Sequence, residues 1–134
     1  MHRFALLLLP LLLGLPIVAG AQTGTANTEA FQARMAENAA RLNLTDEQRA
    51  DLEPILRANF EETRALLQKH GLGQGATERP GLRQMRALQK DMKPVRERTD
   101  RQVAEILSDE QMAEFRLIQD ERREQMRAEI RARR

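Results

Sequence analysis

Residues 44–48 have the sequence Leu-Thr-Asp-Glu-Gln, and residues 107–111 repeat it as Leu-Ser-Asp-Glu-Gln. In each copy Thr45 or Ser108 takes the N-cap position of a helix, and the glutamine three residues later can complete a capping box. Two acidic residues fill the first helical positions, where the helix dipole favours negative charge. The repeat therefore predicts two helix starts, with Leu44, Thr45, Gln48, Leu107, Ser108 and Gln111 as its motif residues.

Apolar residues at helical spacing extend outward from both copies and predict an all-α domain of four helices over residues 28–134. The expected helices begin at Asn27 or Thr28, Asp46, Leu82 and Asp109. On the third helix a three-four alternation predicts one apolar seam, formed by Met85, Leu88, Met92, Val95, Thr99, Gln102 and Ile106.

The glycine-rich residues 71–81 cannot continue a helix, so they predict a turn between the second and third helices. These two helices have equal expected lengths, and we expect them to form an antiparallel hairpin in which the end of one faces the start of the other. Pro54 and Pro94 lie inside them, and a proline costs roughly 3 kcal/mol in a straight helix. Because the apolar stripes continue past both prolines, we expect a long, kinked hairpin.

Residues 1–21 have the pattern of a cleaved signal peptide. An apolar run too short for a membrane anchor is followed by small residues, which predict cleavage before Gln22. Residues 22–27 are then expected to form a disordered tail, and the mature protein is not expected to be membrane-anchored. Removing Arg3 with the signal reduces the 22 Lys and Arg to 21, against 20 Asp and Glu.

The composition argues against several classes of function. The near-neutral mature charge and the absence of Trp and Tyr argue against nucleic-acid binding. Past the signal, the sequence contains no Cys, one Ser that is used as a cap, and one His, His70. We therefore expect no enzyme, no catalytic residues and no cofactor, and His70 alone does not predict a metal site.

Paired L-[TS]-x-x-Q motifs in a small exported helical protein resemble the LTxxQ family, the Spy/CpxP group of periplasmic proteins. The resemblance covers roughly residues 29 to 134. It implies a periplasmic location and a cradle-like antiparallel homodimer. Members act as ATP-independent chaperones, as periplasmic partners of sensor kinases, or as metal-responsive proteins.

These observations favour an ATP-independent periplasmic chaperone that binds unfolded or stress-damaged envelope proteins on an amphipathic helical surface. The alternative is a regulatory partner of the periplasmic domain of an envelope-stress sensor kinase. A zinc- or copper-responsive protein is disfavoured because His70 lacks companion ligands.

Two sets of residues are candidates for partner binding. Apolar positions expected on the uncovered sides of the stripes, and therefore expected to contact clients, are Leu52, Met85, Met92 and Phe115. A basic face on the third helix, expected to lie opposite its apolar seam and to offer a docking surface for an acidic partner, consists of Arg83, Arg86, Lys90 and Lys93. An ordinary solvated face remains the simpler interpretation of the second set.

Overall fold

The computed structural model describes residues 20–133, and within that range it contains four helices and no strand. The helices are α1 (Gly20–Leu42), α2 (Asp46–Lys69), α3 (Leu82–Ala104) and α4 (Asp109–Ala132). The expected all-α class is therefore confirmed. The predicted signal peptide, residues 1–21, lies almost wholly outside the described residues.

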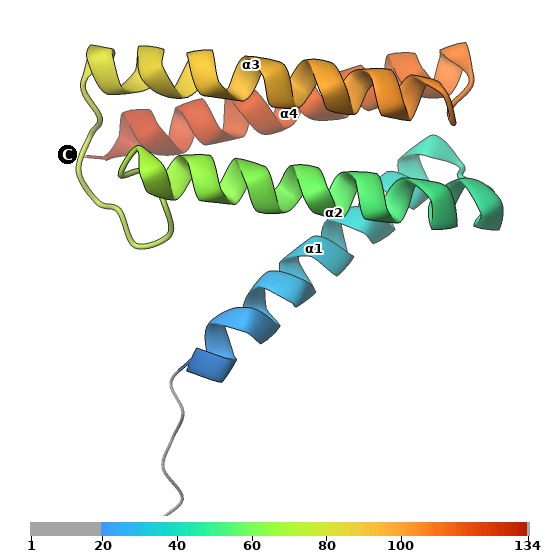
Figure 1. Ribbon diagram of the computed structural model, residues 1–134, viewed down its shortest axis with the longest axis horizontal. Coiled ribbons are helices and arrows are strands. Elements are labelled where there is room, and N and C mark those ends of the chain that lie inside the picture. The colour runs from blue at the N-terminus through green and yellow to red at the C-terminus, as the bar shows by residue number, and fades with distance from the viewer. Residues whose placement is uncertain (1–19, 134) are drawn as a thin grey trace, which may run out of the picture.

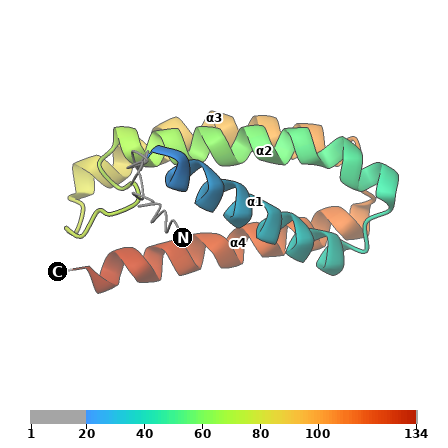
Figure 2. The same ribbon diagram turned by 90° about the horizontal axis from the view of Figure 1, so that it is seen from below.

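The helices α2 and α3 lie side by side and antiparallel (Figure 1). The helix α4 passes behind this hairpin in Figure 1 and beneath it in Figure 2. The helix α1 leaves α2 obliquely, and its first turns stand away from the other three helices. The hairpin is therefore covered by other helices on one side only.

The start of α1 differs from the prediction. The helix begins at Gly20, so residues 22–27, which were expected to form a disordered tail, belong to it. No proline interrupts this stretch, and the hydroxyl of Thr28 donates to the carbonyl of Gly24 one turn earlier at 2.9 Å. The helix therefore does not begin at Asn27 or Thr28, as expected, but runs through these residues.

Both α2 and α3 continue through their interior prolines, Pro54 and Pro94. Neither proline therefore ends a helix, as expected from the apolar stripes. The bend of the hairpin and the cradle-like dimer stay predictions.

The pairing of α2 with α3 is displaced by about two turns from the predicted register. The side-chain amide of Asn59 donates to the hydroxyl of Thr99 at 2.9 Å, and Lys69 Nζ lies 3.0 Å from Asp91 Oδ2. The prediction assumed that the glycine-rich connection simply joins the two helix ends. Instead the connection folds back to bury Leu72, so the first turns of α3 extend past the end of α2.

Two apolar clusters form the core. The motif-end cluster, next to the repeated motifs, consists of Phe31, Met35, Leu42, Leu52, Leu56, Val103, Leu107, Met112, Phe115 and Ile118. The hairpin-end cluster consists of buried Leu72, Leu88 and Met92, with Leu66, Leu67 and Met85 packed against it and partly buried. All four helices contribute to the first cluster, whereas the second contains only the hairpin and its connection.

One predicted position of the apolar seam on α3 is wrong by one residue. Val103 is fully buried on α3 and Gln102 is exposed, because a straight helix with 3.6 residues per turn drifts away from a strict seven-residue repeat. On α1 the polar side chain of Asn38 is buried, and the Arg122 guanidinium donates to its side-chain oxygen at 3.0 Å. That bond supplies the partner that a buried amide needs.

Aromatic and cation–π contacts join α1 to α2. The rings of Phe31 and Phe60 lie 5.7 Å apart between centroids. The guanidinium of Arg57 lies 4.5 Å from the Phe31 centroid, and that of Arg34 lies 4.9 Å from the Phe60 centroid. These cation–π contacts place arginine on the faces of both rings, where the ring quadrupole attracts a cation.

Candidate functional site

Both predicted capping boxes are present. The Thr45 hydroxyl accepts from the Gln48 backbone N–H at 3.1 Å, and the Ser108 hydroxyl accepts from the Gln111 N–H at 3.2 Å. In return, the amide oxygens of the two glutamines accept from the backbone N–H groups of Thr45 and Ser108, at 3.2 and 3.0 Å. The prediction of two capped helix starts is therefore confirmed.

The two capping glutamines also bond to each other. The amide nitrogen of Gln48 donates to the oxygen of Gln111 at 2.9 Å, and the reverse bond measures 3.0 Å. Gln48 donates further to the Ile106 carbonyl at 3.2 Å, and Gln111 to the Leu42 carbonyl at 3.0 Å. We call Gln48 and Gln111 the glutamine pair.

The glutamine pair has no hydrogen-bonding capacity left for a ligand. A primary amide offers two donor hydrogens and two acceptor lone pairs. In each glutamine both donors and both lone pairs are used within the protein. The repeated motif therefore joins the start of α2 to the start of α4 and does not form a binding site.

Two predicted client-contact residues are inaccessible. Leu52 and Phe115 are 0% and 1% exposed inside the motif-end cluster, so the expectation that they lie on uncovered sides is wrong. In the structure side chains of α1 and α4 join Leu52 in this cluster, and Phe115 itself comes from α4.

The other two predicted residues, Met85 and Met92, meet in the hairpin-end cluster. Met92 is buried, so the expectation that it lies on an uncovered side is also wrong. Met85 is only partly buried, as are Leu66 and Leu67. Leu72 completes the cluster from the connection, where the sequence predicted only a turn. The position of Leu72 between two glycines was the one feature of the sequence that could have indicated this burial. Gly71 has φ 70°, a backbone conformation that favours glycine.

A polar cluster borders the hairpin-end cluster. The Asp91 carboxylate lies 2.9 Å from His70 Nε2 and 3.0 Å from Lys69 Nζ. The hydrogen bond from His70, followed by that from Lys69, lowers the pKa of Asp91 below its ordinary value. These bonds tie the end of α2 to α3 beside the partly exposed leucines.

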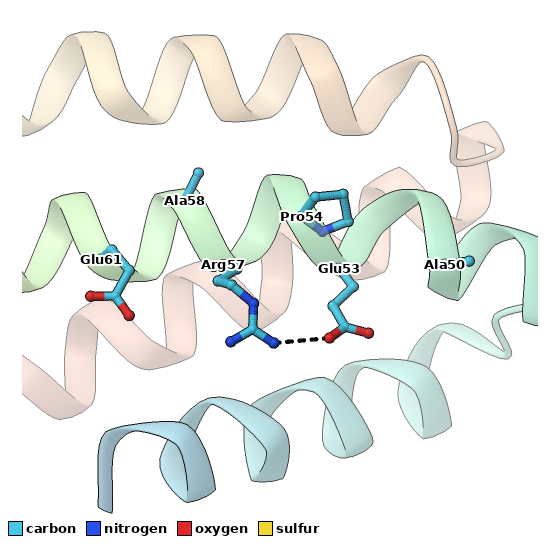
Figure 3. Close-up of a pocket in the computed structure, with 6 residues that line it drawn as sticks. All are labelled: Ala50, Glu53, Pro54, Arg57, Ala58 and Glu61. Atoms are coloured by element: carbon cyan, nitrogen blue, oxygen red, sulfur yellow. Dashed lines mark hydrogen bonds and ion pairs between the residues drawn. The ribbon is translucent and has the colours of Figure 1, made fainter. Parts of the chain in front are cut away.

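The surface of the hairpin carries two shallow depressions, and each contains one interior proline. The first, about 600 Å³, lies along α2 (Figure 3) and is lined by Ala50, Glu53, Pro54, Arg57, Ala58 and Glu61. Glu53 and Arg57, one turn apart on the same side of α2, form an ion pair of 2.9 Å. The second, about 490 Å³, lies between α2 and α3 and is lined by Glu62, Ala65, Leu66, Lys69, Lys90, Asp91, Pro94 and Val95.

These depressions are wide and open, and their linings combine apolar and charged side chains. Neither lining contains Ser, Cys or His, and the charged side chains of the second are Glu62, Lys69, Lys90 and Asp91.

The predicted basic face is exposed along its whole length, at Arg83, Arg86, Lys90 and Lys93. The buried residues of α3, among them Leu88 and Val95, lie on the opposite side of the helix. The expected placement of the basic face opposite the apolar seam is therefore confirmed.

Within residues 20–133, no group of three or more His, Cys, Asp or Glu side chains is arranged to hold a metal ion. No helix in that part of the chain combines the length and apolarity needed to cross a bilayer.

No protein-family model, no curated protein and no solved structure matches the chain. The resemblance to the Spy/CpxP group therefore rests on the paired motifs, the predicted export signal and the helical pattern alone.

Proposed function

We propose that this protein is an ATP-independent periplasmic chaperone that holds unfolded protein segments on the hairpin-end cluster. One observation carries the proposal. The hairpin-end cluster keeps Leu66, Leu67 and Met85 partly exposed, and no residue of α1 or α4 belongs to it.

The composition of this surface suits clients of many shapes. Met has three rotatable bonds and a polarisable sulfur, so it adapts to irregular apolar contacts. Adaptable surfaces of this kind support promiscuous binding, whereas Trp and Tyr, the usual rigid anchors of tight interfaces, are absent from the sequence.

Charged residues border the same surface. Lys69 and Lys90 line the depression beside Leu66, together with Asp91. Charges at the rim of an interface mainly raise the rate of encounter and set its salt dependence, while the apolar centre supplies retention. Capture and release then need no nucleotide, because a weak apolar contact releases the client as the client folds.

The proposal includes a homodimer and no enzymatic activity. A surface limited to one end of a thin hairpin gives a client few contacts, and two copies joined by a two-fold axis would double it. Sedimentation at micromolar concentration tests this part separately, and a clean monomer would contradict it.

The test is light scattering of a chemically denatured protein diluted into buffer without ATP. We expect aggregation to fall as the protein is raised from substoichiometric to excess amounts. Aggregation that is unchanged at excess protein would contradict the chaperone proposal.

A matched pair of variants locates the surface. Met85→Ser removes apolar contact from the hairpin-end cluster, whereas Leu117→Ser removes an apolar side chain, 54% exposed, from α4 outside both clusters. We expect the first variant to suppress aggregation less well and the second to behave as wild type, with urea unfolding confirming that both are folded. Equal losses would show that suppression does not occur at the hairpin end.

The regulatory alternative predicts a different result. The basic face favours it because an acidic sensor domain would complement four cations. Saturable binding to one sensor domain, without suppression of aggregation, would support the regulatory role in place of the chaperone.

A further inference from the structure

The basic face occupies the first turns of α3 on the side that is turned away from the core. Its four cationic side chains follow one another at intervals of three or four residues and therefore share one side of the helix. In Figure 1 the helix forms the upper edge of the molecule, with no other helix beyond it. Lys90 borders the depression between α2 and α3, whereas Arg83, Arg86 and Lys93 line neither depression, so most of the face is a convex line of cations.

Within residues 20–133, three of the four cations of this face have no acidic partner. Between Glu78 and Glu97 the only acidic residue is Asp91, which is turned toward α2 and bonded to Lys69 at 3.0 Å. Lys93 lies 3.8 Å from Glu97, and the other three members of the face form no ion pair with any described residue.

An exposed leucine begins the same line. Leu82, the first residue of α3, is 78% exposed and lies one turn before Arg86. From Leu82 to Lys93 the line extends for about 17 Å along the helix. A large apolar side chain in water at the end of a row of cations matches neither the core nor a simple solvated face.

We propose that this line adsorbs reversibly on the surface of an anionic lipid bilayer, with Leu82 entering the headgroup region. Lys and Arg beside an anionic leaflet gain electrostatic free energy individually, so a row of them binds without specific geometry. Their aliphatic stems tolerate partial burial while the charges stay at the headgroups. Such adsorption needs no membrane-spanning segment and does not depend on the chaperone proposal.

A planar surface fits this line better than an acidic protein segment does. The depression beside Lys90 is lined by Glu62 and Asp91 as well as by two lysines, so it offers an acidic peptide no continuous positive surface. A bilayer contacts only the outermost side chains of a convex helix and avoids both carboxylates.

The experiment measures co-sedimentation of the purified protein with phosphatidylcholine vesicles that contain or lack phosphatidylglycerol. We expect binding only to the vesicles with phosphatidylglycerol, and we expect added salt to weaken it because electrostatic attraction is screened. Each neutralised cation of the face should weaken binding about fivefold, so the triple variant Arg83→Gln, Arg86→Gln, Lys90→Gln should lose on the order of a hundredfold.

A triple control removes the same charge elsewhere, through Arg101→Gln, Arg116→Gln and Arg131→Gln at exposed positions. A further variant, Leu82→Ser, should weaken the binding that remains at high salt while leaving the salt-sensitive part. All six substituted cations and Leu82 are exposed, so circular dichroism should show the native helix content in every variant.

Three outcomes would overturn the proposal. The first is no binding to vesicles with phosphatidylglycerol. The second is an equal loss in the face variant and the control, which would show attraction by net charge alone. The third is binding to polyglutamate without binding to vesicles, which would assign the face to an acidic polypeptide.

Discussion

Replacing Gln48 tests the glutamine pair most directly. In an ordinary capping box glutamate serves as well as glutamine, because only the acceptor oxygen is needed. Here the Gln48 amide nitrogen also donates to the Gln111 side chain at 2.9 Å and to the Ile106 carbonyl at 3.2 Å. Gln48→Glu keeps the cap but loses both donors and places a carboxylate against the Gln111 oxygen.

The expected magnitude follows from the number of bonds lost. Each hydrogen bond contributes about 0.5–1.5 kcal/mol net, and water can replace some of the lost bonds at this partly exposed site. Gln48→Ala should therefore lower the free energy of unfolding by about 2–3 kcal/mol. We expect Gln48→Glu to cost at least as much. The two bonds between the glutamines are lost in either single variant, so the double variant with Gln111→Ala should fall short of additivity by roughly 1–2 kcal/mol.

The assay is urea unfolding followed by circular dichroism at several protein concentrations. The matched control is Gln125→Ala, an exposed glutamine on α4, which we expect to change stability by less than about 0.5 kcal/mol. Two results would refute the idea that the two glutamines stabilise the fold together. The first is a Gln48→Glu variant with unchanged free energy of unfolding, and the second is strict additivity of the two alanine variants.

Two further predictions follow from the caps and from Asp91. Thr45→Ala and Ser108→Ala should each lower the free energy of unfolding by about 1 kcal/mol through the lost N-cap bond, and aggregation suppression should fall only as far as stability does. The bonds from His70 and Lys69 lower the pKa of Asp91. The ionised carboxylate therefore stabilises the folded protein at pH values above the ordinary pKa of 3.8, and this stabilisation is lost as the pH falls through the lowered pKa. An Asp91→Asn variant should therefore lose less stability than wild type on acidification below about pH 4, as measured by thermal unfolding across that range.

The features that sequence predicted well are local. An N-cap depends on residues within one turn, so Thr45 and Ser108 were sufficient to locate the starts of α2 and α4. The end of α2 was equally local, because Gly71 supplies the left-handed residue that closes a helix.

The features that sequence missed depend on residues far apart in the chain. The register of the hairpin follows from where Leu72 is buried, which the spacing of glycines in the connection does not reveal. Leu52 and Phe115 belong to strong apolar stripes, but a stripe does not show which other helix covers it. One feature of the sequence did indicate the glutamine pair. Both copies of the motif have glutamine where glutamate would cap the helix equally well, and only glutamine can also donate hydrogen bonds.

The division of the core into two clusters has a consequence for how the molecule responds to heat. Side chains of all four helices and the glutamine pair stabilise the motif end. Only three buried residues, with the surface bonds of Asp91 to the end of α2, stabilise the hairpin end. A region with so few buried contacts opens at a lower free-energy cost than the whole domain. Warming would therefore separate the last turns of α2 from α3 while the repeated motifs stay joined, and backbone amides there would exchange with solvent first. Conditions that unfold other proteins would in this way also enlarge the apolar surface of this one.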